Sequence, residues 1–174
     1  MTMNNQDETK SKENFPLLGV GPKILITLSP FLVLFGILNS IFHAIFQIPI
    51  NYYWMVILGS ILIIFGISIF IYSERIIKPA YDASEFITIK VYAYVRHPMY
   101  MSWGLGTLPG IFCFFNSWFL FLSLPIYYLI VRIFIIKEEK FLLNKFGKNY
   151  AYYKEKVNAF FPKLNKYKPN VKTS

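Results

Sequence analysis

Two long stretches of the chain contain no lysine, arginine, aspartate or glutamate, and apolar side chains dominate both. The first lies between Lys23 and Glu74, and the second lies between Arg96 and Arg132. A helix needs about 20 apolar residues to cross the hydrocarbon core of a bilayer, so each stretch is long enough for a helical hairpin. Soluble domains have no need of such runs. The pattern therefore predicts an all-α integral membrane protein.

Polar and turn-forming residues divide each stretch into two. Gln47, Pro49 and Asn51 mark a turn in the first stretch, and Asn116 and Ser117 mark one in the second. We therefore expect about four transmembrane helices in two hairpins, over residues 24–46, 52–73, 99–115 and 118–136. Aromatic residues at positions 52–54 and 118 suit the membrane interface beside these turns.

The fourth predicted helix continues as a more polar segment to Phe146. Gly147 is a natural helix terminator, and a second helix over residues 149–159 should follow it, ending before Pro162. Aromatic and apolar side chains recur in that helix at helical spacing, with lysines beside them. We expect a C-terminal amphipathic helix that lies in the membrane interface.

Composition supports this organisation. Of 174 residues, 55% are hydrophobic and 16% are charged, whereas soluble domains carry about a quarter charged residues.

The N-terminus lacks the pattern of a cleaved signal, so residues 1–22 are expected to form a flexible tail. Residues 23–164 are expected to form one membrane domain and residues 165–174 a basic tail. The single cysteine, Cys113, excludes an intramolecular disulfide.

The distribution of basic residues predicts the orientation. Both hairpin turns are uncharged, whereas four basic residues lie between positions 74 and 96, and ten lysines against three acids lie from position 137 onward. The positive-inside rule then places both termini and the central loop in the cytoplasm of a multi-pass protein. The net charge of +9 arises mostly from the C-terminal tail. A lysine-rich segment beside a membrane suits anionic lipids better than nucleic acid.

Two clusters of ionisable residues should meet at the cytoplasmic face. Arg96 and His97 begin the third predicted helix, and Arg132, Glu138 and Glu139 lie near the end of the fourth. Together they offer cations for a carboxylate and acids for an ammonium group or hydroxyls; the alternative is a set of interfacial charges that pair at the membrane edge. Adjacent glutamates point about 100° apart on a helix, so we expect at most one to face a given site, and we expect Arg132 and Glu139 to share a face.

Small and polar residues recur on two other helices. Ser102, Gly106 and Gly110 occur at four-residue intervals, which favours close helix packing and would also leave room for a flat ligand. Asn39, His43 and Gln47 form a polar stripe near the outer face, where we expect interhelical hydrogen bonds.

Two kinds of site are excluded. Two histidines without a nearby cysteine do not make a zinc site, so no metal is expected. The chain also lacks the glycine-rich phosphate loop of a soluble Rossmann-type enzyme.

Two sequence motifs resemble those of a known superfamily. Residues 92–100, which contain Arg96-His97-Pro98-Met99-Tyr100, resemble the RHPxY signature of isoprenylcysteine carboxyl methyltransferases and phospholipid methyltransferases. Residues 138–150 match their EExxLxxxFGxxY pattern. The resemblance covers roughly residues 90–164, which would form the catalytic core. Two motifs in the correct order, separated by one hydrophobic hairpin, make a strong signal.

The resemblance implies a pocket for S-adenosylmethionine on the cytoplasmic side. The cofactor-binding residues would be His97, Tyr100, Glu138 and Glu139, with Gly104 and Gly106 giving the adenosine room to approach. Arg96 would position the loop. Lys156 occupies the place of an arginine that orients a carboxylate substrate in the isoprenylcysteine enzymes, and Arg132 is the other candidate catalytic cation.

The resemblance leaves the methyl acceptor open. Lys90, Ser102 and Ala159 depart from the family pattern, so a prenylated cysteine is not assigned as the acceptor. Because the site should open at the membrane edge, the expected acceptor is a lipid or lipid-linked molecule, with isoprenoids among the options. Two alternatives remain. Membrane sterol reductases share an RHPxY-like segment and bind NADPH, although their second motif differs from this one. A small membrane protein of the same fold without enzymatic activity is the other.

Overall fold

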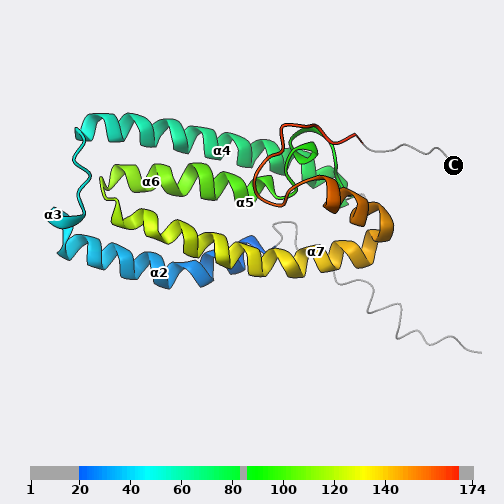
Figure 1. Cartoon of the computed structure of the whole chain (residues 1–174), viewed down its shortest axis with the longest axis horizontal. Coiled ribbons are helices and arrows are strands. Elements are labelled where there is room, and N and C mark those ends of the chain that lie inside the picture. The colour runs from blue at the N-terminus through cyan, green and yellow to red at the C-terminus, as the bar shows by residue number, and fades with distance from the viewer. Residues whose placement is uncertain (1–19, 83–85, 169–174) are drawn as a thin grey trace, which may run out of the picture.

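The computed structural model describes residues 20–82 and 86–168, and Figure 1 shows its arrangement. Most of the predicted N-terminal tail (1–22) and the end of the basic tail lie outside these residues. Regular elements of the described part are helical: α2 (Gly21–Ile41), α3 (His43–Phe46), α4 (Tyr52–Asp82), the 3₁₀ turn η1 (Lys90–Ala93), α5 (Pro98–Ser102), the π-helical turn η2 (Trp103–Thr107), α6 (Leu108–Phe114), the 3₁₀ turn η3 (Phe119–Leu122) and α7 (Ser123–Lys156).

The long helices lie side by side in the order α4, α5–α6, α7 and α2 (Figure 1). The main core forms where α2, α6 and α7 meet, and the side chain of Phe160 from the C-terminal segment closes it. Its buried residues are Val20, Ile24, Leu28, Tyr100, Leu108, Phe112, Leu120, Tyr127, Ile130, Val131, Ile135 and Phe160. The outer surfaces of α2 and α4 carry many exposed large apolar side chains, as expected for helices that face lipid.

Three helical stretches are long and apolar enough to cross a membrane: Gly21–Ile41, Tyr52–Ala80 and Phe119–Lys156. They coincide with three of the four predicted crossings and confirm an all-helical membrane architecture. The third predicted crossing forms three consecutive pieces of 5, 5 and 7 residues, from Pro98 to Phe114. The count of four crossings therefore stays a prediction.

Close packing between α4 and the Pro98–Phe114 segment depends on glycines. A Cβ atom built on Gly66 would lie 2.6 Å from the backbone nitrogen of Thr107, and one on Gly106 would lie 2.6 Å from the Cα atom of Gly66. Gly59 and Gly110 approach each other similarly farther along the pair. The close helix packing predicted from Ser102, Gly106 and Gly110 is confirmed at both glycines.

Gly147 breaks α7, as predicted. Its φ of 53° and ψ of −130° lie in a region that residues with a side chain rarely adopt. The chain turns there, and helix resumes to Lys156. Tyr150, Tyr153 and Val157 are buried on this last segment and pack against Phe86. The location of the segment in a membrane interface remains a prediction.

The polar stripe on the first helix differs from expectation. Asn39 is buried, yet its side-chain oxygen has no hydrogen-bond partner among the described residues. Asn39, His43 and Gln47 line a pocket at the end of the bundle instead of joining neighbouring helices. The predicted interhelical hydrogen bond is absent at the side-chain oxygen of Asn39 among the described residues.

Candidate functional site

The RHPxY segment is held by backbone pairing with the chain that follows α7. The amide of Arg96 donates to the carbonyl of Asn158 at 2.9 Å, and the amide of His97 donates to Ala159 at 3.0 Å. Two further bonds, from the amides of Lys163 and Tyr167, continue the attachment to residues 93–94. Pro98 then begins α5 at a position where its missing N–H costs nothing. Backbone contacts alone therefore fix this segment, through its pairing with the chain after α7 and through the start of α5 at Pro98.

Arg96 connects three parts of the chain through its guanidinium group. Its Nε and Nη2 atoms donate to Oε1 of Glu139 at 2.9 and 2.5 Å. Its Nη1 atom donates to the carbonyl oxygens of Lys154 and Val157. Both charged side chains are less than a tenth exposed. A buried charge is tolerated only when it is paired and hydrogen-bonded, and these contacts meet that requirement.

Two further groups surround the Glu139 carboxylate. Lys154 Nζ lies 2.9 Å from its second oxygen, and His97 Nε2 lies 3.4 Å from the first. With Arg96, three basic side chains from two segments converge on one acid. Glu139 is therefore the centre of the ionic contacts and is already occupied by protein partners.

Glu138 lies on the other side of the His97 ring. Its Oε1 is 3.7 Å from His97 Nδ1, and its Oε2 accepts a 2.9 Å hydrogen bond from the hydroxyl of Tyr100. Which of the two glutamates would face a cofactor stays a prediction, but both lie beside the same side chain. The imidazole lies between the two carboxylates with one ring nitrogen toward each, so residues 96–100 reach both.

Tyr100 is fixed at both ends. Its hydroxyl accepts a hydrogen bond from the backbone amide of Val20 at 3.1 Å, and its carbonyl accepts one from the hydroxyl of Tyr127 at 2.7 Å. Its ring stacks on that of His97 with centroids 5.6 Å apart. The start of α2 and the middle of α7 therefore both help to orient the side chain that donates to Glu138.

Tyr92 supports the cluster from the chain that precedes it. Burial raises the pKa of the Tyr92 hydroxyl, and the negative charge of Glu138 raises it further. The Tyr92 carbonyl accepts a 2.6 Å hydrogen bond from the hydroxyl of Tyr153. The Tyr92 hydroxyl itself donates to the carbonyl of Ser73 at 3.4 Å. The loop before α5 is therefore attached both to α4 and to the last turns of α7.

The two predicted catalytic cations lie outside the cluster. Arg132 is exposed, and the polar stripe expected to join it to buried Glu139 is not formed. Lys156 is about half exposed; it pairs with Glu155 at 3.1 Å and lies over the ring of Tyr152. Their catalytic roles stay predictions.

The space beside the two predicted cofactor glycines is filled by protein. A Cβ atom on Gly104 would lie 2.7 Å from the ring of Tyr127 and 2.8 Å from that of Phe160, and Gly106 faces Gly66. Close packing thus explains both glycines in this structure. Their contact with a cofactor remains a prediction.

Sequence reasoning missed Lys154, Tyr127 and the backbone of Val20. Lys154 is separated from Glu139 by the break at Gly147, so no helical spacing relates them. Tyr127 is one aromatic residue among many in an apolar helix. A backbone amide leaves no signal in a sequence at all.

In chemical terms, the cluster joins two carboxylates, an imidazole and a phenol. Glu138 is the more exposed of the two acids, with 16% of its side chain accessible against 7% for Glu139. Its Oε1 has no neighbour within ordinary hydrogen-bond distance among the described residues. Glu138 can therefore accept a further hydrogen bond from a hydroxyl or an ammonium group.

Comparison with known proteins agrees with this chemistry. The model of the isoprenylcysteine carboxyl methyltransferase (ICMT) family matches residues 44–145, which include both the RHPxY segment and the glutamate pair. No curated protein and no solved structure matches the chain. Because the match spans more than half of the sequence and contains the clustered residues, the chain belongs to the isoprenylcysteine carboxyl methyltransferase family of membrane methyltransferases.

Proposed function

We propose that the protein transfers a methyl group from S-adenosylmethionine to a lipid or lipid-linked acceptor at the cytoplasmic face of a membrane. One observation carries the proposal: the two family motifs, which are 38 positions apart at Tyr100 and Glu138, form a single buried cluster through a direct hydrogen bond. A purely structural role for the two motifs would not require two carboxylates around one imidazole.

The residues present suit this cofactor. S-adenosylmethionine has hydroxyl and ammonium donors, and Glu138 has a carboxylate oxygen able to accept from them. Tyr150 lies near both glutamates, and its buried hydroxyl has no partner among the described residues. His97, Tyr100 and Glu138 would therefore hold the cofactor. Glu139, which Arg96, His97 and Lys154 already contact, would position that group.

Methyl transfer requires few catalytic groups from the protein. The sulfonium of the bound cofactor supplies an already activated methyl group. The chain's own task is to hold the acceptor in line with that carbon and to exclude water, and much of the acceleration comes from this positioning. A carboxylate acceptor needs no general base. A cation such as Lys156 or Arg132 would orient such an acceptor, although neither contacts the cluster.

The surroundings support a lipid acceptor. The cluster lies toward one end of a bundle whose outer surface is apolar, so an acceptor anchored in the bilayer would be held near it. Exposed lysines on α7 and beyond would bind anionic lipids on the same side. The cytoplasmic assignment rests on these basic residues.

Calorimetric titration of the purified protein tests the proposal. S-adenosylmethionine should give binding heat, and NADPH should give none. Glu138→Gln should weaken S-adenosylmethionine binding about tenfold or more, because the variant loses charge-assisted hydrogen bonds. The matched change Glu155→Gln, at an exposed position on the same helix, should leave the affinity unchanged.

Each contrary result has a defined meaning. Heat with NADPH alone would favour the reductase, and no heat with either would favour a protein without enzymatic activity. Incubation of membranes with methyl-labelled cofactor, followed by lipid extraction, would then identify the acceptor class.

A further inference from the structure

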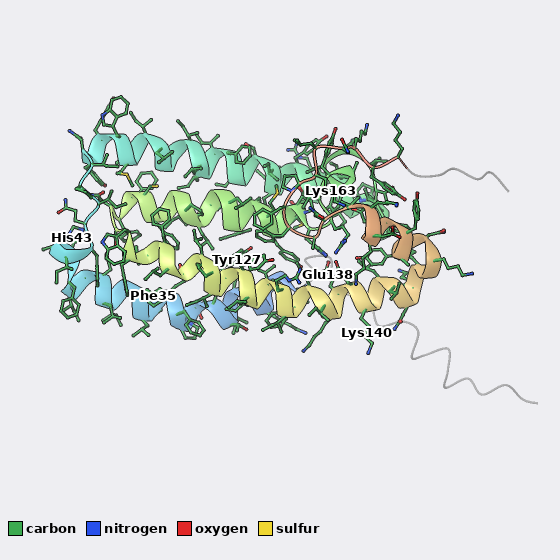
Figure 2. All side chains as sticks on the ribbon, in the orientation of Figure 1. Phe35, His43, Tyr127, Glu138, Lys140 and Lys163 are labelled. Carbon is green, nitrogen blue, oxygen red and sulfur yellow. The ribbon has the colours of Figure 1, made fainter. Side chains whose placement is uncertain are left out.

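Arg132 lies in the apolar part of α7, outside the cluster of the methyl-transfer site. Figure 2 shows Tyr127 nearer the middle of the long axis and Glu138 farther along α7, and Arg132 lies between them in this helix. Its side chain is exposed. Its guanidinium makes no hydrogen bond or ion pair with the described residues.

The position of Arg132 along the span places it inside the hydrocarbon layer. The span begins at Phe119, beside Trp118, which is exposed as interfacial aromatic residues are. About 20 Å of helix separate Phe119 from Arg132 at the usual rise per residue, whereas the hydrocarbon core is about 30 Å thick. Arg132 therefore lies about 10 Å short of the boundary on the Glu138 side, and an exposed cation at this depth is costly unless an anion meets it.

The outer face of α7 offers Arg132 no such anion. Leu129 and Ile136 lie three and four residues away, so they flank Arg132 on the helix surface, and they are 61% and 64% exposed. Residues 128–136 contain no Asp or Glu. The guanidinium is therefore an isolated positive charge on an apolar surface that faces lipid.

The chain after α7 extends this apolar surface. Phe161 is 54% exposed, and its ring centroid lies 6.2 Å from that of Tyr128. Tyr128 is four residues before Arg132, so it lies on the same side of the helix and one turn farther from the Glu138 end. The ring of buried Phe160 lies 5.5 Å from that of Tyr128 and fixes this contact. The exposed ring of Phe161 thus continues the surface from Arg132 toward the middle of the bilayer.

The order of these groups matches a lipid in the leaflet on the Glu138 side. The cation lies nearest the boundary, and apolar side chains lie beside it and deeper. The planar guanidinium can donate two parallel N–H bonds to phosphate oxygens. We propose that Arg132, Leu129 and Phe161 bind one anionic phospholipid, with its phosphate on Arg132 and an acyl chain on the other two. A headgroup with an ammonium already neutralises its own phosphate, so an anionic lipid is preferred to a zwitterionic one.

This lipid site is separate from the methyl-transfer cluster. About 9 Å of helix separate Arg132 from Glu138. A phosphate on Arg132 leaves Lys156 as the candidate cation for a carboxylate acceptor. Because cofactor binding depends on Glu138 and lipid binding on Arg132, either proposal can fail without the other.

Lipid retention at high salt tests the proposal. The full-length protein is reconstituted in bilayers of equal parts phosphatidylglycerol and phosphatidylcholine with identical acyl chains, then extracted in detergent. A wash in about 1 M salt shortens the Debye length to about 3 Å and screens diffuse attraction by the exposed lysines. Mass spectrometry of the remaining lipid should show phosphatidylglycerol roughly fivefold over phosphatidylcholine, as one charge-assisted contact would give.

Two variants locate the bound lipid. Arg132→Gln should bring the two lipids to equal retention, and its melting temperature in lipid-free detergent should match that of the wild type because the side chain is exposed. Lys140→Gln, at an exposed position of α7 beyond the glutamate pair, removes the same charge and should keep the preference. Phosphatidylglycerol with a photoreactive group in one acyl chain should label the peptides that contain Leu129 or Phe161 in the wild type but not in Arg132→Gln.

Three results would overturn the proposal. One is equal retention of the two lipids by the wild type, or a preference that Arg132→Gln keeps. Another is an equal loss of preference in Arg132→Gln and Lys140→Gln, which would show general attraction by basic residues. The last is binding of inorganic phosphate that Arg132→Gln abolishes, without preferential retention of phosphatidylglycerol, which would assign the arginine to a soluble anion.

Discussion

The guanidinium group of Arg96 and the carboxylate of Glu139, 43 positions apart, form a buried ion pair through two nitrogen atoms of the arginine. The same arginine donates to carbonyl groups on either side of the end of α7. The pair thus links the beginning of α5 to the middle and the end of the last helix.

Arg96→Lys should destabilise the protein although it keeps the charge. An ammonium group cannot match the planar, forked geometry that serves Glu139 and two carbonyls together. Breaking a buried pair costs about 3–5 kcal/mol, and lysine should recover only part of it. Thermal unfolding in detergent measures the loss, and the exposed position Arg132→Lys is the control. Equal melting temperatures for the two variants would contradict the role of the fork.

Tyr100→Phe should separate ligand binding from stability. The change removes the donor to Glu138 and the acceptor for the Val20 amide, at a cost of about 2 kcal/mol. The fold should persist, whereas S-adenosylmethionine affinity should fall at least as far as in Glu138→Gln. Tyr94→Phe is the matched control because its ring is at the surface. If Tyr100→Phe binds the cofactor normally, the hydrogen bond has no part in binding.

Gly66→Ala should weaken the packing of α4 on the Pro98–Phe114 segment. The added methyl group would meet backbone atoms of Thr107 and Ser102, which cannot rotate away. Overpacking of this kind costs about 1–3 kcal/mol. Gly36→Ala, on a helix face with nothing within 4 Å, should be neutral or slightly stabilising. If the two variants had the same melting temperature, the close approach of α4 to the Pro98–Phe114 segment would be contradicted.

Gly147→Ala isolates the cost of backbone conformation. No atom lies within 4 Å of the position that the new Cβ would take, so the effect arises from φ and ψ alone. Such conformations cost about 1–3 kcal/mol in residues with a side chain. We expect a lower melting temperature and faster proteolysis between Phe146 and Lys148. A continuous, stable helix in the alanine variant would show that the break needs no glycine.

A tag inserted at Asn51 tests the orientation. The turn is exposed, lies at the end opposite the glutamate cluster and carries no charge. An antibody against the tag should label intact cells, whereas a tag after Lys168 should be labelled only after permeabilisation. The reverse result would move the proposed methyl-transfer site to the outer face.

The helical plan could be predicted because apolar runs and their interruptions are properties of local sequence. The turn at positions 47–51, the turn at Asn116 and Ser117, and the break at Gly147 all occur where predicted. The division of the third predicted helix into three pieces could not be predicted. The π-helical turn at Trp103–Thr107 packs against α4, and that contact is not a property of local sequence. Helix α4 also continues past Ser73 into a charged segment that composition alone assigned to a loop.

The residues of the candidate site could be predicted from the two motifs, but their arrangement in space could not. The motifs brought His97, Tyr100 and both glutamates together, but they did not show that the His97 ring lies between the two carboxylates. The contact of Lys154 with Glu139 depends on the break in α7 at Gly147, which helical spacing does not describe.

The order of synthesis gives the carboxyl-terminal attachment of Arg96 a further meaning. Translation releases the α2, α4 and α5–α6 helices first, yet the amides of residues 96–97 and the Nη1 atom of Arg96 find their partners at positions 154–159. A nascent chain that has inserted every long helix still has an incomplete cluster. The protein consequently acquires its site as one of the last events of its biogenesis, after the bilayer has already closed around it.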